Sequence, residues 1–172
     1  METADGLMTE TLKPETDAQV LDAVKWAEAG KTPLAVRGRG SKDGFGRAVD
    51  IPHCLDLSDL SAITAYEPNE LYMTALAATP IAEIKAALRQ NNQQMAFEPP
   101  DLGVLYGNRG GTIGGAIACN LAGPRRIQAG AARDHFLGFN AVSGRGEVFK
   151  SGGTVVKNVT GFDLSKLLAG SF

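Results

Sequence analysis

The spacing of apolar residues predicts a helix near the start of the chain. From Val20 onward, apolar side chains recur at i, i+1, i+4 and i+7, which places them on one face of a helix over residues 17–29. Thr16 or Asp17 offers a side chain that can cap the start of this helix. Gly30 follows the last apolar position and is expected to end it.

Short apolar runs bounded by turn-forming residues predict strands in the middle of the chain. The expected strands cover residues 33–36, 54–57, 63–66 and 71–76. Thr79 and Pro80 then predict a second helix, with the threonine hydroxyl as its cap and the proline at its first position. This helix is expected to end near Asn91. Helices that alternate with strands in this way favour βαβ-type packing.

The second half of the chain has a less regular pattern. We expect a short helix of small residues over 112–120, a hairpin over 136–142 and 147–150, and a final helix over 162–169. No internal repeat or low-complexity tract is visible. The pattern predicts a flexible leader over residues 1–13, and the length of 172 residues fits one domain or two small lobes.

Composition and charge narrow the class of protein. The 172 residues are 44% hydrophobic and 21% charged, as in an ordinary globular chain. The net charge of −2 argues against nucleic acid as the main partner. No apolar run approaches the ~18 residues that span a bilayer, and the N-terminus lacks the basic and apolar regions of a signal peptide. We therefore expect a cytoplasmic protein without a transmembrane segment.

The residues that commonly carry metal or nucleophilic chemistry are isolated. Cys54 and Cys119 form no CxxC pair, and His53 and His135 stand alone. No zinc-protease motif or nucleophile elbow is present. We expect two reduced thiols, no metal site, and no catalytic acid–base set that can be named from this sequence.

Glycine is in excess, and part of the excess lies in a loop after the first predicted strand. Glycine makes up 21 of the 172 residues, about 12% against a typical value of about 7%. Arg37 to Ser41 reads Arg-Gly-Arg-Gly-Ser, whose backbone N–H groups can turn toward one anion. The loop matches neither the Walker A nor the GxGxxG pattern. It is therefore either an anion site or a flexible surface turn.

A second glycine-rich loop covers residues 107–115 and leads into the short helix of small residues. A glycine-rich turn at a helix start can bind phosphate through free N–H groups and the helix dipole. The alternative is tight helix packing through small residues. Because two such loops occur, an extended ligand with two phosphates is favoured. Gly114→Val or Gly115→Val is expected to abolish its binding.

An ordered set of motifs resembles a known family. They are Arg37-Gly38-Arg39-Gly40-Ser41, Leu55-Asp56-Leu57-Ser58, Glu98-Pro99-Pro100, the segment from Gly111 to Ala118, Arg133-Asp134 and Gly161-Phe162-Asp163-Leu164. The set is similar to the FAD-binding (PCMH-type) domain of the vanillyl-alcohol-oxidase flavoproteins. Residues 120–126 and 156–167 look most like the FAD-binding E subunit of bacterial glycolate oxidase (glycolate dehydrogenase).

The resemblance implies a fold, a cofactor and a set of contacts. The fold would be an α+β FAD-binding (PCMH-type) domain over residues 14–172, with two lobes and an FAD cleft between them. The residues implied to contact FAD are Arg37, Gly38, Arg39, Gly40, Ser41, Pro100, Gly110, Gly111, Thr112, Gly114, Gly115, Asn120, Gly123, Gly130, Val142 and Gly161. Because the first loop lacks the histidine that attaches FAD in some relatives, we expect non-covalent FAD. Arg125 and Arg126 either form a solvated basic surface or contact FAD or a partner.

The resemblance also implies an activity and partners. The expected reaction is oxidation of a 2-hydroxy acid, glycolate to glyoxylate, with electrons passing through flavin to an iron–sulfur subunit. A homologous flavin subunit is a further expected partner, and the complex would lie in the cytoplasm or peripherally at the inner membrane. The alternatives are a non-catalytic assembly module and a related FAD-linked oxidoreductase for another hydroxy acid or alcohol. The chain is expected to be C-terminally truncated, without the substrate-binding cap domain, and inactive alone.

Overall fold

Strands and helices alternate along the parts of the chain that the computed structural model describes, residues 10–47, 50–106, 110–153 and 162–171. The elements are β1 (Glu10–Leu12), α1 (Asp17–Gly30), β2 (Leu34–Arg37), β3 (His53–Asp56), β4 (Ile63–Glu67), β5 (Tyr72–Ala75), α2 (Ile81–Gln90), α3 (Leu102–Tyr106), α4 (Ile113–Ala118), α5 (Arg126–Ala129), α6 (Ala132–His135), β6 (Gly138–Val142), β7 (Val148–Gly152) and α7 (Leu164–Leu168). The mixed α and β content that the sequence predicts is confirmed.

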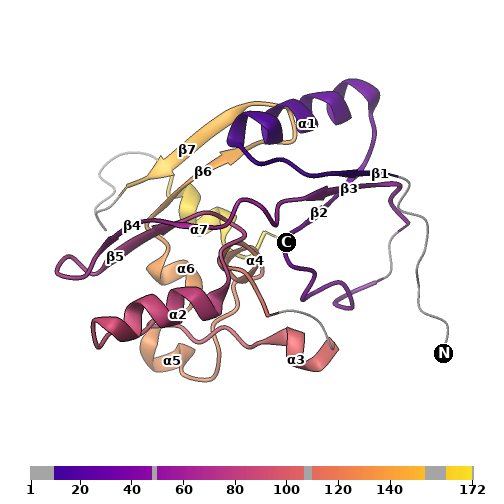
Figure 1. The fold of residues 1–172 in the computed structure, drawn as a ribbon. Helices are drawn as coiled ribbons and strands as arrows, with labels where there is room; N and C mark the ends of the chain where they lie inside the picture. Colours follow the sequence, from indigo (N-terminus) through magenta and orange to yellow (C-terminus); the bar gives the residue numbers. More distant parts are fainter. Residues whose placement is uncertain (1–9, 48–49, 107–109, 154–161, 172) are drawn as a thin grey trace.

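A three-stranded parallel sheet forms the N-terminal part of the fold. Its order is β1-β3-β2, so β3 lies in the middle, and its Cys54 and Leu55 are each only 2% exposed. Helix α1 connects β1 to β2 (Figure 1), which is the βαβ arrangement expected from the sequence. The flexible leader predicted for residues 1–13 is wrong for Glu10–Leu12, because these residues add a strand to the edge of β3.

Two antiparallel hairpins complete the β structure of the described residues. Strand β4 pairs with β5, and β6 pairs with β7. In the second hairpin, the rings of Phe139 and Phe149 meet edge to face, with centroids 5.4 Å apart. Helix α1 lies beside this hairpin at the top of Figure 1, whereas α2, α3 and α5 lie at the bottom. The observed hairpin starts at Gly138 and ends at Gly152, two residues later than predicted at each end.

The ends of two helices differ from the sequence prediction in an informative way. Thr16 caps α1 as expected, and its side chain accepts a hydrogen bond from the N–H of Gln19. Lys31, not Gly30, adopts the left-handed conformation after the helix, with φ of 49°. Thr79 does not cap α2. Its Oγ1 instead accepts from the N–H of Ala62 at 3.0 Å and donates to the same residue's carbonyl at 2.9 Å.

Three short helices were not predicted, and two predicted ones are shorter than expected. Helices α3, α5 and α6 contain only four or five residues each, too few for an apolar period to be visible. Helix α4 covers Ile113–Ala118 and α7 covers Leu164–Leu168. The segment after α7 contacts α4, since the N–H of Gly170 donates to the carbonyl of Ile117 at 3.1 Å.

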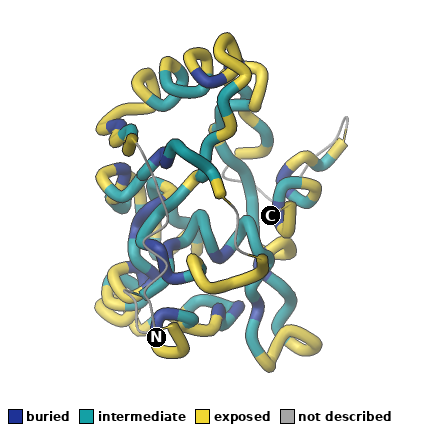
Figure 2. The backbone as a smooth tube through the Cα atoms, turned by 90° about the vertical axis from the view of Figure 1, so that its right-hand side faces the viewer, coloured by how far each residue is buried: buried dark blue, intermediate teal, exposed yellow. Residues whose placement is uncertain are grey.

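The buried core is small for a chain of this length. Twelve apolar residues of the described ranges are buried, and six of them are alanines. Helix α1, at the top of Figure 2, has Ala27 as its single buried residue. The longest helix, α1, has 14 residues, and no helix in the described ranges has the length and apolar character needed to cross a membrane.

Candidate functional site

The two glycine-rich loops lie next to each other, joined through the segment between β5 and α2. The N–H of Ile81 donates to the carbonyl of Gly111, and the N–H of Ile113 donates to the carbonyl of Thr79, both at 3.0 Å. A Cβ built on Gly38 would lie 3.2 Å from Oγ1 of Thr112, so the first loop also touches the second. Two loops about 70 positions apart in sequence therefore lie side by side in the fold.

The start of α4 is not a free anion site, contrary to the sequence prediction. The N–H of Ile113 is bonded to Thr79 and that of Gly114 to the carbonyl of Ala77 at 2.8 Å. The N–H of Gly115 donates to Oγ1 of Thr112 at 3.2 Å. The first three donors of this helix are thus used within the protein, and the small residues here serve packing.

The first loop is held in shape by an ion pair across it. The guanidinium of Arg37 lies 2.5 Å from the carboxylate of Asp43. Gly40, between them, has a φ of +73°, and a Cβ at this position would lie 2.5 Å from the Arg37 guanidinium. Only glycine fits this turn without strain. Arg37 and Gly40 therefore shape the loop, and the residues at its centre face the neighbouring wall.

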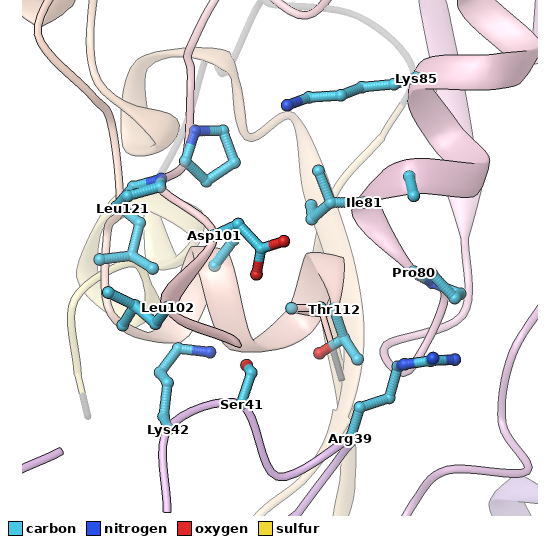
Figure 3. Close-up of a pocket in the computed structure, with 16 residues that line it drawn as sticks. Arg39, Ser41, Lys42, Pro80, Ile81, Lys85, Asp101, Leu102, Thr112 and Leu121 are labelled. Atoms are coloured by element: carbon cyan, nitrogen blue, oxygen red, sulfur yellow. The ribbon is translucent and has the colours of Figure 1, made fainter. Parts of the chain in front are cut away.

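A cavity of about 190 Å³ opens where the two loops meet the start of α2 and the segment before α3 (Figure 3). The predicted site residues that line it are Arg39, Ser41, Pro100, Gly110, Gly111 and Thr112. Further lining residues are Lys42, Pro80, Ile81, Ala82, Lys85, Pro99, Asp101, Leu102, Ala116 and Leu121. The sequence prediction thus identified part of the lining and missed the contribution of α2.

The cavity is rich in unpaired positive charge. Three of its lining side chains are cations, namely Arg39, Lys42 and Lys85, and one is a carboxylate, Asp101. Within the described residues, none of these four side chains takes part in an ion pair. Their summed charge is +2 in a chain whose net charge is −2. This local excess favours an anionic ligand.

One buried donor of the cavity has no hydrogen-bond partner among the described residues. The Nε of Arg39 is buried and bonded to no protein atom among the described residues, and Ser41 is only 5% exposed. A Cβ on Gly111 would meet only the Oγ of Ser41, at 3.6 Å, so the space above this backbone is open. A buried donor without an acceptor is costly. An anion in the cavity would satisfy the guanidinium and fill the space that Gly111 leaves.

Lys42, Lys85 and Asp101 are the charged lining residues of the cavity that the sequence prediction missed. Lys85 follows Ile81 by four positions, so both lie on the same face of α2. Asp101 follows the two prolines of the resemblance motif directly. A face analysis of α2 would have identified Lys85, whereas the place of Asp101 depends on tertiary contacts. In Figure 3 the Asp101 carboxylate lies between Lys85 on one side and Ser41 with Lys42 on the other.

Several predicted site residues lie outside this cavity. Asn120 has a φ of 47°, and its side chain accepts a hydrogen bond from the N–H of Arg133 at 3.1 Å. Gly123 packs against the backbone of Glu98, and Gly130 against His135. Val142 lines a separate, open hollow between α1 and the β6–β7 hairpin. Gly161 lies outside the described residues.

Arg125 and Arg126, which follow α4, have different surroundings. Arg125 forms an ion pair with Glu98, with Nε 2.9 Å from the carboxylate, while Arg126 is exposed. Arg125 thereby joins the loop after α4 to the segment that carries Pro99 and Pro100. This ion pair lies next to the cavity and not in it, because neither Arg125 nor Arg126 is a lining residue.

The two cysteines are free thiols, and burial is the main cause of the raised pKa of each. Cys54 lies in β3, and burial raises the pKa of its thiol despite the nearby Arg37. Burial also raises the pKa of Cys119, at the end of α4, and Lys42 opposes this shift. A raised pKa leaves little thiolate at neutral pH, so neither group is an activated nucleophile. Within the described ranges, no cluster of three potential metal ligands is present.

Comparisons with known proteins agree on the type of domain. A family described as "FAD binding domain" matches residues 10–152. The "Glycolate oxidase subunit GlcE" of Escherichia coli (strain K12) is 42% identical over 153 residues, which is 89% of this chain and 42% of that protein. The "D-2-hydroxyglutarate dehydrogenase" of Xanthomonas citri pv. viticola is 29% identical over 160 residues, 92% of this chain and 32% of that protein.

A solved structure has the same fold. An alkyldihydroxyacetonephosphate synthase superposes with a TM-score of 0.70 over 94% of this chain and 28% of its own, at 14% sequence identity. At that identity the likeness concerns the fold alone. The chain therefore spans less than half the length of each of these relatives.

Proposed function

Because this chain belongs to the FAD-binding domain family, we propose that it is the cofactor-binding part of a glycolate-oxidising enzyme subunit. The observation that carries the proposal is the 42% identity to a glycolate oxidase subunit over 89% of this chain. The reaction converts the alcohol of glycolate to the aldehyde of glyoxylate, which removes two electrons and two protons. When bound, FAD supplies the acceptor for the hydride from the alcohol carbon.

The residues of the cavity fit the pyrophosphate of FAD. At neutral pH this group carries two negative charges, which match the net charge of +2 from Arg39, Lys42, Lys85 and Asp101. The N–H groups of Ser41, Gly111 and Thr112 donate to no other group in the described chain, and their residues line the cavity. In this proposal the arginine, the lysines and these N–H groups hold the diphosphate.

The size of the cavity limits what it holds. Pockets that enclose a whole small-molecule ligand measure about 300–1,000 Å³. The 190 Å³ here accommodates the pyrophosphate, so the flavin and adenosine ends extend beyond it. Asn120, Gly123, Gly130, Val142 and Gly161 stay as predicted contacts to those ends. Gly114 and Gly115 support the cavity wall from behind.

We further propose that FAD is bound without a covalent link. The first loop contains no histidine, Cys54 is buried, Cys119 is half-buried, and the pKa of each thiol is raised. Acid precipitation of the flavin-loaded protein should therefore release all the flavin into the supernatant. Flavin that stays in the pellet would contradict this part of the proposal.

The proposed setting is an enzyme complex in the cytoplasm, with any contact to the inner membrane made through the complex. A homologous flavin subunit and an iron–sulfur subunit that receives the electrons are the proposed partners, because the relative is itself named a subunit. The activity belongs to the complete enzyme, and residues 1–172 alone are expected to bind cofactor without turning over substrate.

The substrate is tested with the complete enzyme that contains this chain. Reduction of a dye acceptor is followed with glycolate, D-lactate and D-2-hydroxyglutarate, each with the natural chain and with Arg39→Gln. Glycolate should give the highest kcat/KM, and Arg39→Gln should lower the flavin content. A preference for D-2-hydroxyglutarate, which the second relative favours, would replace glycolate with another 2-hydroxy acid.

A second candidate function is a non-catalytic assembly module that keeps the fold but binds no FAD. The exposed large apolar side chains of the described residues, among them Val104, Leu105 and Ile127, favour a chain that packs against other protein. The presence of bound flavin in the purified complex at one FAD per copy of this chain would exclude this candidate. A colourless subunit that still assembles would support it.

A further inference from the structure

The carboxylate of Asp101 is out of place in a cavity that otherwise suits an anion. It is the single acidic side chain among the residues that line the cavity in the described structure, and three cations line the same space. A negative charge close to a bound phosphate weakens phosphate binding. Its presence therefore needs a reason other than recognition of the diphosphate.

One of its two oxygens has a structural partner. Oδ1 accepts a hydrogen bond from the N–H of Gly103 at 3.0 Å, which stabilises the first turn of α3. Oδ2 makes no hydrogen bond or ion pair within the described residues. This oxygen faces the second loop, since a Cβ on Gly110 would lie 3.4 Å from it. The hydrogen bond to Gly103 thus accounts for Oδ1 and leaves Oδ2 able to accept a hydrogen bond from a ligand.

Asp101 is an exposed residue that lines the cavity, and the backbone that carries it is restricted. Pro99 and Pro100 precede it and restrict the chain, and α3 begins immediately after it. Figure 3 shows the carboxylate pointing into the space between Lys85 and Lys42. A carboxylate is an acceptor only, so the groups it can bind are hydroxyl or N–H donors of the ligand.

We propose that Asp101 accepts a hydrogen bond from a sugar-type hydroxyl that neighbours the diphosphate of the bound ligand. The inference rests on the proposed FAD function, because FAD carries hydroxyls on the ribityl chain and on the ribose that flank its pyrophosphate. The cavity then recognises two chemical classes at once. Arg39 and Lys42 select the phosphates, and Asp101 selects for a hydroxyl beside them.

The test uses Asp101→Asn, because asparagine keeps an oxygen for the N–H of Gly103 and loses the second acceptor. Binding of FAD to residues 1–172 is measured by flavin fluorescence, and inorganic pyrophosphate is measured as a competitor. FAD affinity should fall about tenfold, the loss of one charge-assisted hydrogen bond, while pyrophosphate affinity should stay the same or rise. The melting temperature without ligand should not change.

The other outcomes separate the possible roles of Asp101. FAD affinity that stays the same or rises would overturn the inference, because the carboxylate would then only repel phosphate. An equal loss of FAD and pyrophosphate affinity would also overturn it and would indicate a purely structural role. A natural chain that binds no FAD would instead contradict the proposed function itself.

Two further competitors identify the hydroxyl. FMN carries the ribityl hydroxyls with one phosphate, and ADP carries the ribose hydroxyls with a diphosphate. If the hydroxyl is on the ribityl chain, Asp101→Asn should weaken FMN about tenfold and leave ADP unweakened. The reverse pattern would assign the ribose. Weakening of neither would contradict the inference.

Discussion

Gly114 lies directly against Ala77, at the point where the second glycine-rich loop becomes a helix. Its N–H donates to the carbonyl of Ala77 at 2.8 Å, and a Cβ on Gly114 would lie 2.7 Å from the same oxygen. The glycine therefore allows two backbones to approach closely. The sequence prediction assigned this close approach to a ligand, whereas the protein itself occupies the space.

Gly114→Ala should destabilise the protein even without any ligand. The added methyl group overlaps the backbone of Ala77, which costs about 2 kcal/mol after the small gain in helix propensity. Urea unfolding of the ligand-free protein measures this change. Equal stability of the variant and the natural protein would show that the contact with Ala77 is relaxed in solution.

Gly111→Ala is the matched substitution in the same loop. It should leave the stability of the ligand-free protein almost unchanged and weaken FAD binding. Its Cβ would meet only the Oγ of Ser41, at 3.6 Å, so the ligand-free protein should unfold within about 0.5 kcal/mol of the natural one. The methyl group would, however, enter the cavity and lower FAD affinity at least tenfold. Calorimetric titration with FAD measures the second effect. Unchanged affinity would place the cofactor elsewhere.

Thr79 joins the two halves of the cavity wall, and its hydroxyl should be important for stability. Thr79→Val removes both hydrogen bonds to Ala62 and leaves the half-buried N–H of Ala62 without a partner, whereas the carbonyl of Ala62 keeps its hydrogen bond from the N–H of Leu76, so the cost should be about 1–3 kcal/mol. Thr79→Ser keeps the hydroxyl and should cost about 1 kcal/mol, for the lost methyl group. Unfolding by urea compares the two variants. Equal losses would mean that the hydroxyl contributes little.

Asp134 gives the fold a component of stability that depends on pH. The N–H of Ala131 donates to its carboxylate at 2.8 Å, which lowers the pKa of Asp134 below its ordinary value of 3.8. The unfolded chain therefore binds this proton at higher pH than the folded one. The contribution is complete well above pH 3.8 and is lost as pH falls through the lower folded pKa. Melting temperatures of the natural protein and Asp134→Asn should converge as pH falls below 3.8, and a constant difference would contradict this.

The sequence predicted most elements, since their apolar periods are local. The helix of residues 17–29, strands β2 and β3, and the two hairpins all follow from spacing and turn residues, and each is found within about two residues of its expected bounds. The edge strand Glu10–Leu12 was missed because a three-residue strand has no period and depends on its neighbour β3.

The candidate site was predicted less completely, for reasons that concern tertiary contacts. Thr79-Pro80 has the same sequence signal whether the threonine caps a helix or bonds to Ala62, 17 residues earlier. Glycines were correctly predicted to gather at one place, yet spacing alone could not separate Gly111, which faces the cavity, from Gly114, which faces Ala77. Lys85 and Asp101 reach the cavity only through the packing of α2 and α3.

We propose that residues 1–172 hold FAD with its pyrophosphate between the two glycine-rich loops. Titration of the purified, flavin-free chain with FAD, followed by quenching of flavin fluorescence, tests this most directly. We predict saturable binding of one FAD per chain that weakens as salt concentration rises, because the cations Arg39, Lys42 and Lys85 line the cavity. The absence of saturable binding, or binding that does not respond to salt, would contradict the account.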